Sequence, residues 1–221
     1  MTVCCGCLLL VAQLAVSGES VRPQAPAAPA RPPARPPAPP GLSWEDADHV
    51  AETVARLERR LQAGKPASRE PIAVSEREVN SYVTLSLAPR IPPALSGLNF
   101  HIEPGRLAAS GTLDLDAVRS QLPKDGASSL LAFLSGAVPV LLKGRFQGAN
   151  GQGHVEVDEA SVAGISLPSA LLAQIVAQAT RSAKQPRGFD LLAPFPLPWT
   201  ARSVRLEAGR AVVEFAEDAR P

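Results

Sequence analysis

The sequence predicts an α+β fold, in which a curved antiparallel sheet of hairpins wraps around one or two helices. Three observations support this prediction. Three pairs of segments alternate apolar and polar residues around short turns that contain glycine, which indicates β-hairpins with one apolar face. Other segments carry apolar residues at helical spacing on a single stripe. A sheet with one apolar face must bury that face, so we expect the helices to cover it.

The three hairpins follow one another along the second half of the chain. The first spans residues 98–115, with Pro104 and Gly105 at the positions that a type II turn prefers. The second spans residues 138–162 around a glycine-rich turn, and the third spans residues 204–215. In the strand predicted at the start of the second hairpin, one face carries Val140, Leu142 and Phe146.

Two helices have clear start signals. Ser43 is the expected cap of the first, and Ser75 and Glu78 form an S-x-x-E capping box for the second, which should end before Pro89. The apolar stripe of the first helix consists of Trp44, Ala47, Val50, Ala51, Val54, Leu57 and Leu61.

Three further helices are expected between and after the hairpins. Residues 115–122 and 128–134 predict two short ones, and residues 168–184 predict a longer one. The apolar face of the longer helix consists of Leu171, Leu172, Ile175, Val176 and Ala179. We expect this face to meet the apolar face of the strand that carries Phe146.

The first eighteen residues, MTVCCGCLLLVAQLAVSG, resemble a signal peptide. Residues 3–16 form an apolar run of fourteen residues; a membrane-spanning helix needs about 20. No Lys or Arg precedes the run, which is unusual for a signal peptide. We expect residues 1–18 to be removed on export to the periplasm or cell envelope. All three cysteines lie in this segment, so the mature chain would form no disulfide.

A proline-rich linker is expected at residues 19–41. Residues 22–41 contain nine prolines, six alanines and three arginines. Proline fixes φ and removes backbone donors, so this segment should be an extended tether without a core of its own. After it we expect an amphipathic helical segment at 42–66, one folded domain at 67–217 and a tail at 218–221.

Composition and motifs argue against several functions. The chain has 22 basic and 21 acidic residues, which gives a formal net charge of +1. This balance does not indicate a surface that binds nucleic acid. It contains no G-x-S-x-G, H-E-x-x-H or Walker motif. The segment GANGQG at residues 148–153 joins two predicted strands, so no helix N-terminus is available there for phosphate. We therefore expect a protein that is not an enzyme and needs no cofactor.

His154, Glu156 and Asp158 are the candidates for a metal site. They lie on one face of a predicted strand, and this set of side chains suits a divalent metal. Residues two apart on a strand are about 6.5–7 Å apart, which is too far for easy chelation from one strand. We therefore interpret them as the solvent face of a hairpin and expect no metal site.

Residues 72–215 resemble bacterial extracytoplasmic proteins of the LmeA-like and YceB-like kind, which are related in fold to tubular lipid-binding (TULIP) proteins. Three short motifs carry the resemblance: an E-x-N element at Glu78–Asn80, a second element at Gly164–Pro168, and a terminal element at Val204–Val212. The resemblance implies a half-barrel sheet wrapped on a long helix, with acyl chains in the seam between them. The proline-rich linker and the N-terminal helix of this chain differ from the pattern of the family.

Asn80 matches the asparagine of the family's E-x-N element. An asparagine inside a helix is mildly unfavourable because its amide competes for backbone partners. We expect Ser75, Glu78 and Asn80 to act as a structural clamp, with the Asn80 amide paired to the backbone of an adjoining strand or loop. A contact with a ligand headgroup is the alternative role for Asn80.

Two functions remain open. The first is a lipid-binding or lipid-carrying protein outside the cytoplasm, with a lipid or a membrane surface as its partner. Its expected lipid-binding residues are the apolar faces of the strand and the long helix, namely Val140, Leu142, Phe146, Leu171, Leu172, Ile175, Val176 and Ala179. The second is a structural or assembly protein of the cell envelope, with a packed core and a protein partner that the sequence does not identify.

Overall fold

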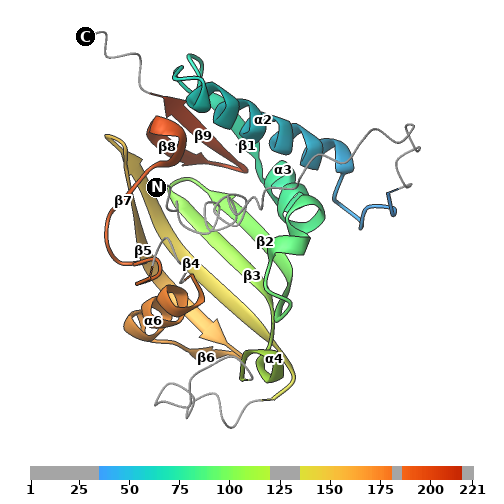
Figure 1. Cartoon of the computed structure of the whole chain (residues 1–221). Helices are drawn as coiled ribbons and strands as arrows, with labels where there is room; N and C mark the ends of the chain where they lie inside the picture. Colours follow the sequence, from blue (N-terminus) through green and yellow to red (C-terminus); the bar gives the residue numbers. More distant parts are fainter. Residues whose placement is uncertain (1–34, 120–134, 181–185, 216–221) are drawn as a thin grey trace.

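The computed structural model describes residues 35–119, 135–180 and 186–215 (Figure 1). Within these residues the chain forms a large open antiparallel sheet and a few helices, which confirms the α+β class. The predicted signal peptide, the helix at 128–134 and the tail at 218–221 lie outside the described residues. The same is true of most of the linker and of the ends of the helices predicted at 115–122 and 168–184.

Nine strands among the described residues form one sheet. Its main path runs through β1 (Ile72–Ser75), β9 (Arg210–Phe215), β8 (Ala201–Glu207), β4 (Ala137–Ala149), β3 (Arg106–Asp114) and β2 (Leu95–Glu103). β5 (Gln152–Val162) pairs with the other edge of β4 and also with two short strands, β6 (Ile165–Ser166) and β7 (Phe195–Pro196). All of these pairings are antiparallel.

The structure contains all three predicted hairpins. Each turn has two residues between paired strand ends, which are Glu103 and Arg106, Ala149 and Gln152, and Glu207 and Arg210. In the second turn both central residues are left-handed, with φ of 52° at Asn150 and 75° at Gly151. Asparagine followed by glycine is the pair that tolerates this geometry best, which explains the choice of residues there.

The two parts of the sheet join where β4 meets β8, and backbone hydrogen bonds from Gly105 to Leu206 and from Gly209 to Ile102 add to this junction. β4 pairs with β8 only between Gly148 and Val204. A Cβ atom at Gly148 would lie 2.9 Å from the backbone nitrogen of Val204, so only glycine allows this approach. Gly153 is similarly covered by the Phe195 ring, 2.5 Å from where its Cβ would lie. The glycines of GANGQG are therefore explained by the geometry of the turn and by the short distance between the packed strands.

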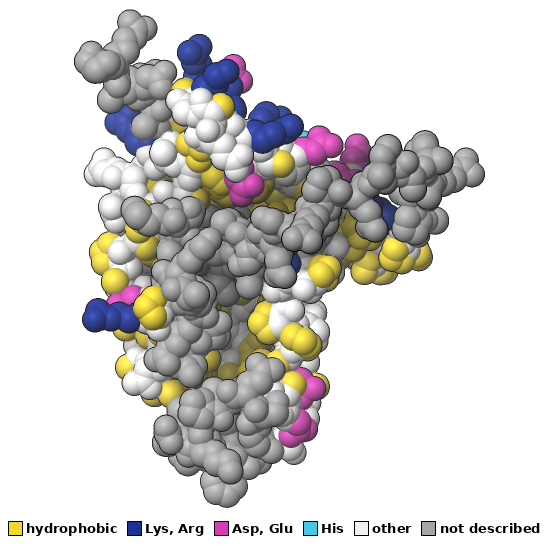
Figure 2. Space-filling model, viewed as in Figure 1, with side chains coloured by type: hydrophobic (Ala, Val, Ile, Leu, Met, Phe, Trp, Pro, Cys, Tyr) yellow, Lys and Arg dark blue, Asp and Glu magenta, His cyan; other side chains and the backbone are white. Residues whose placement is uncertain are grey.

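α2 (Trp44–Gln62) begins at the predicted cap, where the Ser43 hydroxyl accepts hydrogen bonds from the backbone of Glu45 and Asp46. Its buried residues are Ala47, Val50, Thr53 and Leu57. The segment before it also contacts α2, because the Arg35 guanidinium lies 4.7 Å from the centre of the Trp44 ring. The predicted linker therefore includes residues that contact the folded part. Lys and Arg side chains gather on the surface where α2 ends (Figures 1 and 2).

The helix that begins at Ser75 changes type after two turns, contrary to the prediction of one helix up to residue 88. α3 covers Glu76–Ser81, and a π-helical turn, η1 (Tyr82–Ser86), follows it. A 3₁₀ turn, η2 (Ala88–Arg90), then contains the proline that was expected to end the helix. No glycine or proline between residues 82 and 88 signals the change. π-Helical turns are rare and occur often at functional sites.

The capping box of α3 is complete and links to α2. The Glu78 carboxylate accepts hydrogen bonds from the backbone N–H and the hydroxyl of Ser75, at 2.7 and 2.6 Å. Its other oxygen lies 2.6 Å from Nδ1 of His49 on α2. Burial acts to raise the pKa of Glu78, but these hydrogen bonds outweigh it and hold the pKa below the ordinary 4.5.

The Glu78 carboxylate should therefore stabilise the fold in a pH-dependent way. Its contribution is present above pH 4.5 and is lost as the pH falls through the lowered folded-state pKa. We expect Glu78→Gln to lower the free energy of unfolding at about pH 7 and to have a much smaller effect at about pH 3. Urea denaturation at both pH values tests this, with the exposed Glu52→Gln as control. An equal loss at both pH values would contradict it.

Two of the remaining helices, α4 and α6, lie toward the other end of the sheet. α4 (Leu115–Arg119) follows β3, and α6 (Ser169–Ala179) lies beside β5 (Figure 1). A 3₁₀ turn, η3 (Pro198–Thr200), precedes β8. The longest described helix is α2, which packs on α3 and η1.

The main core lies between α3, η1 and one face of the sheet. Its buried residues come from α3 and η1 (Val79, Val83), the strands (Phe100, Ile102, Phe146, Ala201, Leu206, Ala211), and the segment before β8, which supplies Phe189, Leu191, Phe195 and Leu197. The rings of Phe189 and Phe195 meet edge to face at 5.3 Å. A second, smaller cluster holds Leu115, Val138 and Val162 at the far end of β4.

Candidate functional site

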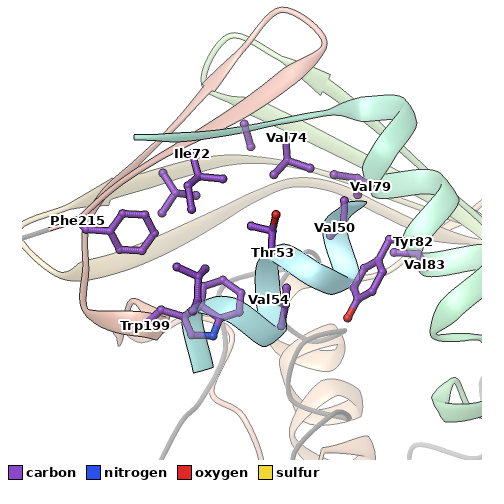
Figure 3. A pocket seen from close by; sticks show the side chains of 13 residues that line it. Val50, Thr53, Val54, Ile72, Val74, Val79, Tyr82, Val83, Trp199 and Phe215 are labelled. Carbon is purple, nitrogen blue, oxygen red and sulfur yellow. The ribbon is translucent and has the colours of Figure 1, made fainter. Parts of the chain in front are cut away.

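An apolar pocket of about 80 Å³ lies between α2 and the end of the sheet formed by β1 and β9 (Figure 3). Six elements line it: α2 with Val50, Thr53, Val54 and Leu57; β1 with Ile72 and Val74; α3 with Val79; η1 with Tyr82 and Val83; η3 with Trp199; and β9 with Ala211, Val213 and Phe215. In this view Phe215 lies at the left, across from Thr53 on α2, and Trp199 lies next to Val54.

The pocket wall carries no charge. Its polar side-chain atoms belong to Thr53, Tyr82 and Trp199. The Thr53 hydroxyl already accepts a hydrogen bond from Arg56 at 3.1 Å. Burial raises the pKa of the Tyr82 phenol, so this group is neutral throughout the physiological pH range. Cavities with such walls stay free of water and bind hydrocarbon groups.

Two walls of the pocket have an unusual backbone. η1 contributes Tyr82 and Val83 from its π-helical turn. Opposite, Trp199 and Thr200 both adopt left-handed conformations, with φ of 52° and 56°. A β-branched residue such as threonine is rarely found there, and strained backbone of this kind clusters at ligand-binding sites. This turn places the Trp199 side chain against the pocket.

α2 is attached by polar contacts at its first half only. The backbone N–H of Ser43 donates to Ser81, Asp46 pairs with Arg77 at 2.9 Å, and His49 contacts Glu78. Beyond His49, no described side chain of α2 makes a hydrogen bond or ion pair with another helix or strand. The half of α2 that covers the pocket is therefore held to other helices and strands by apolar contacts, and its Arg60 side chain also donates to the Pro66 carbonyl of the loop that follows.

Asn80 joins α3 to the edge strand of the sheet. Its amide nitrogen donates to the carbonyl of Phe100 at 2.8 Å, and its amide oxygen accepts from the N–H of the same residue at 2.7 Å. The Glu76 carboxylate accepts from the N–H of Ile102 at 2.7 Å. Asn80 is 6% exposed, so both of its bonds are shielded from water. α3 thus satisfies backbone groups that the edge strand β2 would otherwise expose.

Four described residues of the predicted lipid seam divide between the two core clusters. Phe146, Leu172 and Val176 pack in the main core, whereas Val140 packs in the second cluster. Leu142 lines a void of only about 30 Å³.

Two more predicted seam residues, Leu171 and Ile175, are half-buried and belong to neither cluster. The side chain of Ala179 lies outside those that the structure describes. The physical reason for the difference is the segment after α6. Its Leu191 lies beside Leu142 and Phe146, on the face of β4 where the long helix was expected.

The predicted metal candidates lie on an exposed face. Glu156 and Asp158 both pair with Arg145, at 2.7 and 3.0 Å, and His154 is exposed beside them. Throughout the described ranges, no group of three or more His, Cys, Asp or Glu residues could hold a metal ion.

A scan against models of protein families, a search of curated proteins and a search of solved structures found no match. The resemblance to LmeA-like and YceB-like proteins therefore stays a prediction from the sequence motifs. In the part of the chain that the structure covers, no helix has the length and apolar character needed to cross a membrane.

Proposed function

We propose that this protein binds the apolar part of a lipid, and that the pocket between α2 and the β1–β9 end of the sheet receives an acyl chain. The observation that carries the proposal is the uncharged wall of the pocket, built from valine, leucine, isoleucine and aromatic side chains of six elements. The π-helical turn at Tyr82 and the left-handed backbone at Trp199 support it, because both features are typical of binding sites.

The size of the pocket limits the ligand. About 80 Å³ is roughly half of the 150 Å³ cavity that holds one benzene ring, so the pocket takes a few methylene groups as it stands. Four methylenes would contribute about 3 kcal/mol, which corresponds to weak binding. A longer chain requires the second half of α2 to move outward. That motion separates mainly apolar contacts, because the polar contacts of α2 with other helices and strands lie in its first half. In the second half, Arg60 bonds only to the Pro66 carbonyl of the loop that follows.

The fold type, the location and the partner predicted from the sequence are consistent with this proposal. We propose a half-barrel of the tubular lipid-binding type that acts outside the cytoplasm, with a lipid or a membrane surface as its partner. The open antiparallel sheet supports this architecture. The acyl site that we propose differs from the predicted seam, since it uses α2 and β9 in place of α6 and β4.

A second function is a structural or assembly protein of the cell envelope with a packed core. The packing of side chains against β4 favours this second function, because the void beside Leu142 measures only about 30 Å³. Under this alternative the pocket at α2 is a packing defect and binds no lipid.

Val54→Phe tests the proposal. Val54 is half-buried on α2 and faces the pocket, so a phenyl ring should occupy the space that an acyl chain needs (Figure 3). We expect one palmitate to bind the wild-type chain and at least about tenfold weaker binding to the variant, measured by native mass spectrometry and calorimetry.

Ala55→Phe is the matched control, because Ala55 is the exposed neighbour of Val54 and does not line the pocket. This control should bind palmitate like the wild type. Equal palmitate binding by all three proteins would contradict the assignment of the acyl chain to this pocket. No binding by the wild type would favour the packed-core alternative.

A further inference from the structure

A polar groove of about 440 Å³ lies on the other side of the line where α2 meets β1. Five residues line both the groove and the apolar pocket, namely Val50, Thr53, Leu57, Ile72 and Val74. The groove is therefore separated from the pocket by one layer of side chains. Its outer rim carries Arg56 and Arg60 from α2 and Arg69 from the loop before β1.

Among the described residues, the three arginines of the groove have no carboxylate partner. Arg56 donates to the Thr53 hydroxyl at 3.1 Å, and Arg60 donates through Nε to the Pro66 carbonyl at 2.8 Å. Arg69 makes no hydrogen bond or ion pair within the described residues. Five other described arginines are paired with carboxylates, namely Arg35, Arg77, Arg145, Arg205 and Arg210. Arg59, Arg90, Arg106, Arg187 and Arg202 have no such partner among the described residues, but they do not line this groove. The groove thus concentrates positive charge that the protein does not neutralise.

The local charge balance favours an anion. Glu70 lies in the groove, and His49 at its other end already contacts Glu78. Three guanidinium groups therefore face one carboxylate. Arg59 and Lys65 add positive charge nearby. Figure 2 shows that Lys and Arg side chains gather where α2 ends. Guanidinium groups bind phosphate oxygens through pairs of parallel hydrogen bonds, and Arg56 and Arg60 both retain free terminal donors.

We propose that the groove binds the phosphate group of an anionic lipid whose acyl chain enters the adjoining pocket; this rests on the proposed function. Arg56 connects the two parts, because it borders the groove and its guanidinium holds the hydroxyl of Thr53 in the pocket wall. The phosphate contact adds affinity to an acyl pocket that is too small to bind tightly alone.

The test compares lysophosphatidic acid with a monoacylglycerol of the same chain length, because the two differ only in the phosphate. Binding to the full chain is measured by calorimetry at low salt, for the wild type, for Arg60→Gln combined with Arg69→Gln, and for Arg59→Gln; Arg60 and Arg69 line the groove but not the pocket. Arg59 lies on the same turn as Arg60 but does not line the groove, and it bonds only to the carbonyl of Ala55. Thermal melts verify that all variants fold.

We expect the wild type to bind lysophosphatidic acid roughly tenfold or more tightly than the monoacylglycerol. The double variant should lose this difference and keep its binding of the monoacylglycerol, and Arg59→Gln should behave as the wild type. Equal affinities for both lipids, or a difference that survives in the double variant, would overturn the phosphate site and leave the acyl pocket standing.

Binding of inorganic phosphate distinguishes a site for a lipid phosphate group from a site for free phosphate. Under the proposal inorganic phosphate binds far more weakly than lysophosphatidic acid, because it lacks the acyl chain. A different set of results would indicate a site for free phosphate. In that case phosphate binds the wild type as tightly as lysophosphatidic acid does, phosphate does not bind the double variant, and the monoacylglycerol binds neither protein. That result would overturn the lipid-headgroup assignment and the proposed function together, while keeping the arginines as an anion site.

Discussion

Replacing Asn80 by alanine is expected to lower the free energy of unfolding by about 2–3 kcal/mol. The substitution removes two buried hydrogen bonds to the backbone of Phe100 and leaves that N–H and carbonyl without partners, away from water. Asn80→Asp should also destabilise the fold, because a carboxylate cannot donate to the Phe100 carbonyl. Urea denaturation of the purified variants measures both effects.

The matched control is Asn99→Ala, which removes an exposed asparagine from the neighbouring strand β2 and should change the unfolding free energy by less than about 0.5 kcal/mol. If Asn80→Ala were as stable as the wild type, the role of α3 in closing the edge of the sheet would be wrong.

Gly148→Val is expected to destabilise the fold by about 2–3 kcal/mol or more. Valine is a good strand residue, so propensity alone would predict a gain. Its Cβ, however, would lie 2.9 Å from the backbone nitrogen and 3.0 Å from the carbonyl oxygen of Val204. Neither atom can move without separating β4 from β8, which are paired only at this point.

Ala149→Val provides the comparison for Gly148→Val, since Ala149 is the exposed next residue of the same strand. Thermal melts of the two variants should differ strongly. Similar melting temperatures would show that the junction between β4 and β8 adapts more easily than its geometry indicates.

Most of the sheet could be predicted because its signals are local. The turns at Pro104–Gly105 and Asn150–Gly151 lie within a few residues of the strands that they join, and alternation marks the strand faces. The change from α3 to a π-helical turn at Tyr82 had no such signal, since its sequence lacks glycine and proline. The segment 186–197 was also missed as part of the core, because its apolar residues follow no helical or strand period.

The candidate pocket was harder to predict than the fold. Asn80 was recognisable as a clamp because asparagine is unfavourable inside a helix unless its amide has a hydrogen-bond partner. The pocket residues come from six elements, and Val54, Val213 and Trp199 are brought together only by tertiary packing. Periodicity identified the apolar faces of α2 and α6 equally well, but it could not decide which of them leaves a space against the sheet.

The central claim is that an acyl chain enters the pocket beside Trp199. The chain has two tryptophans, of which Trp199 lines the pocket and Trp44 does not. Trp44 instead donates a hydrogen bond to the carbonyl of Pro36 at the start of α2. Trp44→Phe and Trp199→Phe therefore each leave a single fluorescent reporter, one inside the proposed site and one outside it.

The most direct measurement is quenching of these two reporters by a fatty acid brominated near the end of its chain, since bromine quenches tryptophan only at contact range. The account predicts saturable quenching of Trp199 in the Trp44→Phe variant and none of Trp44 in the Trp199→Phe variant. Equal quenching of both tryptophans, or no quenching of Trp199 at saturating fatty acid, would contradict the acyl pocket.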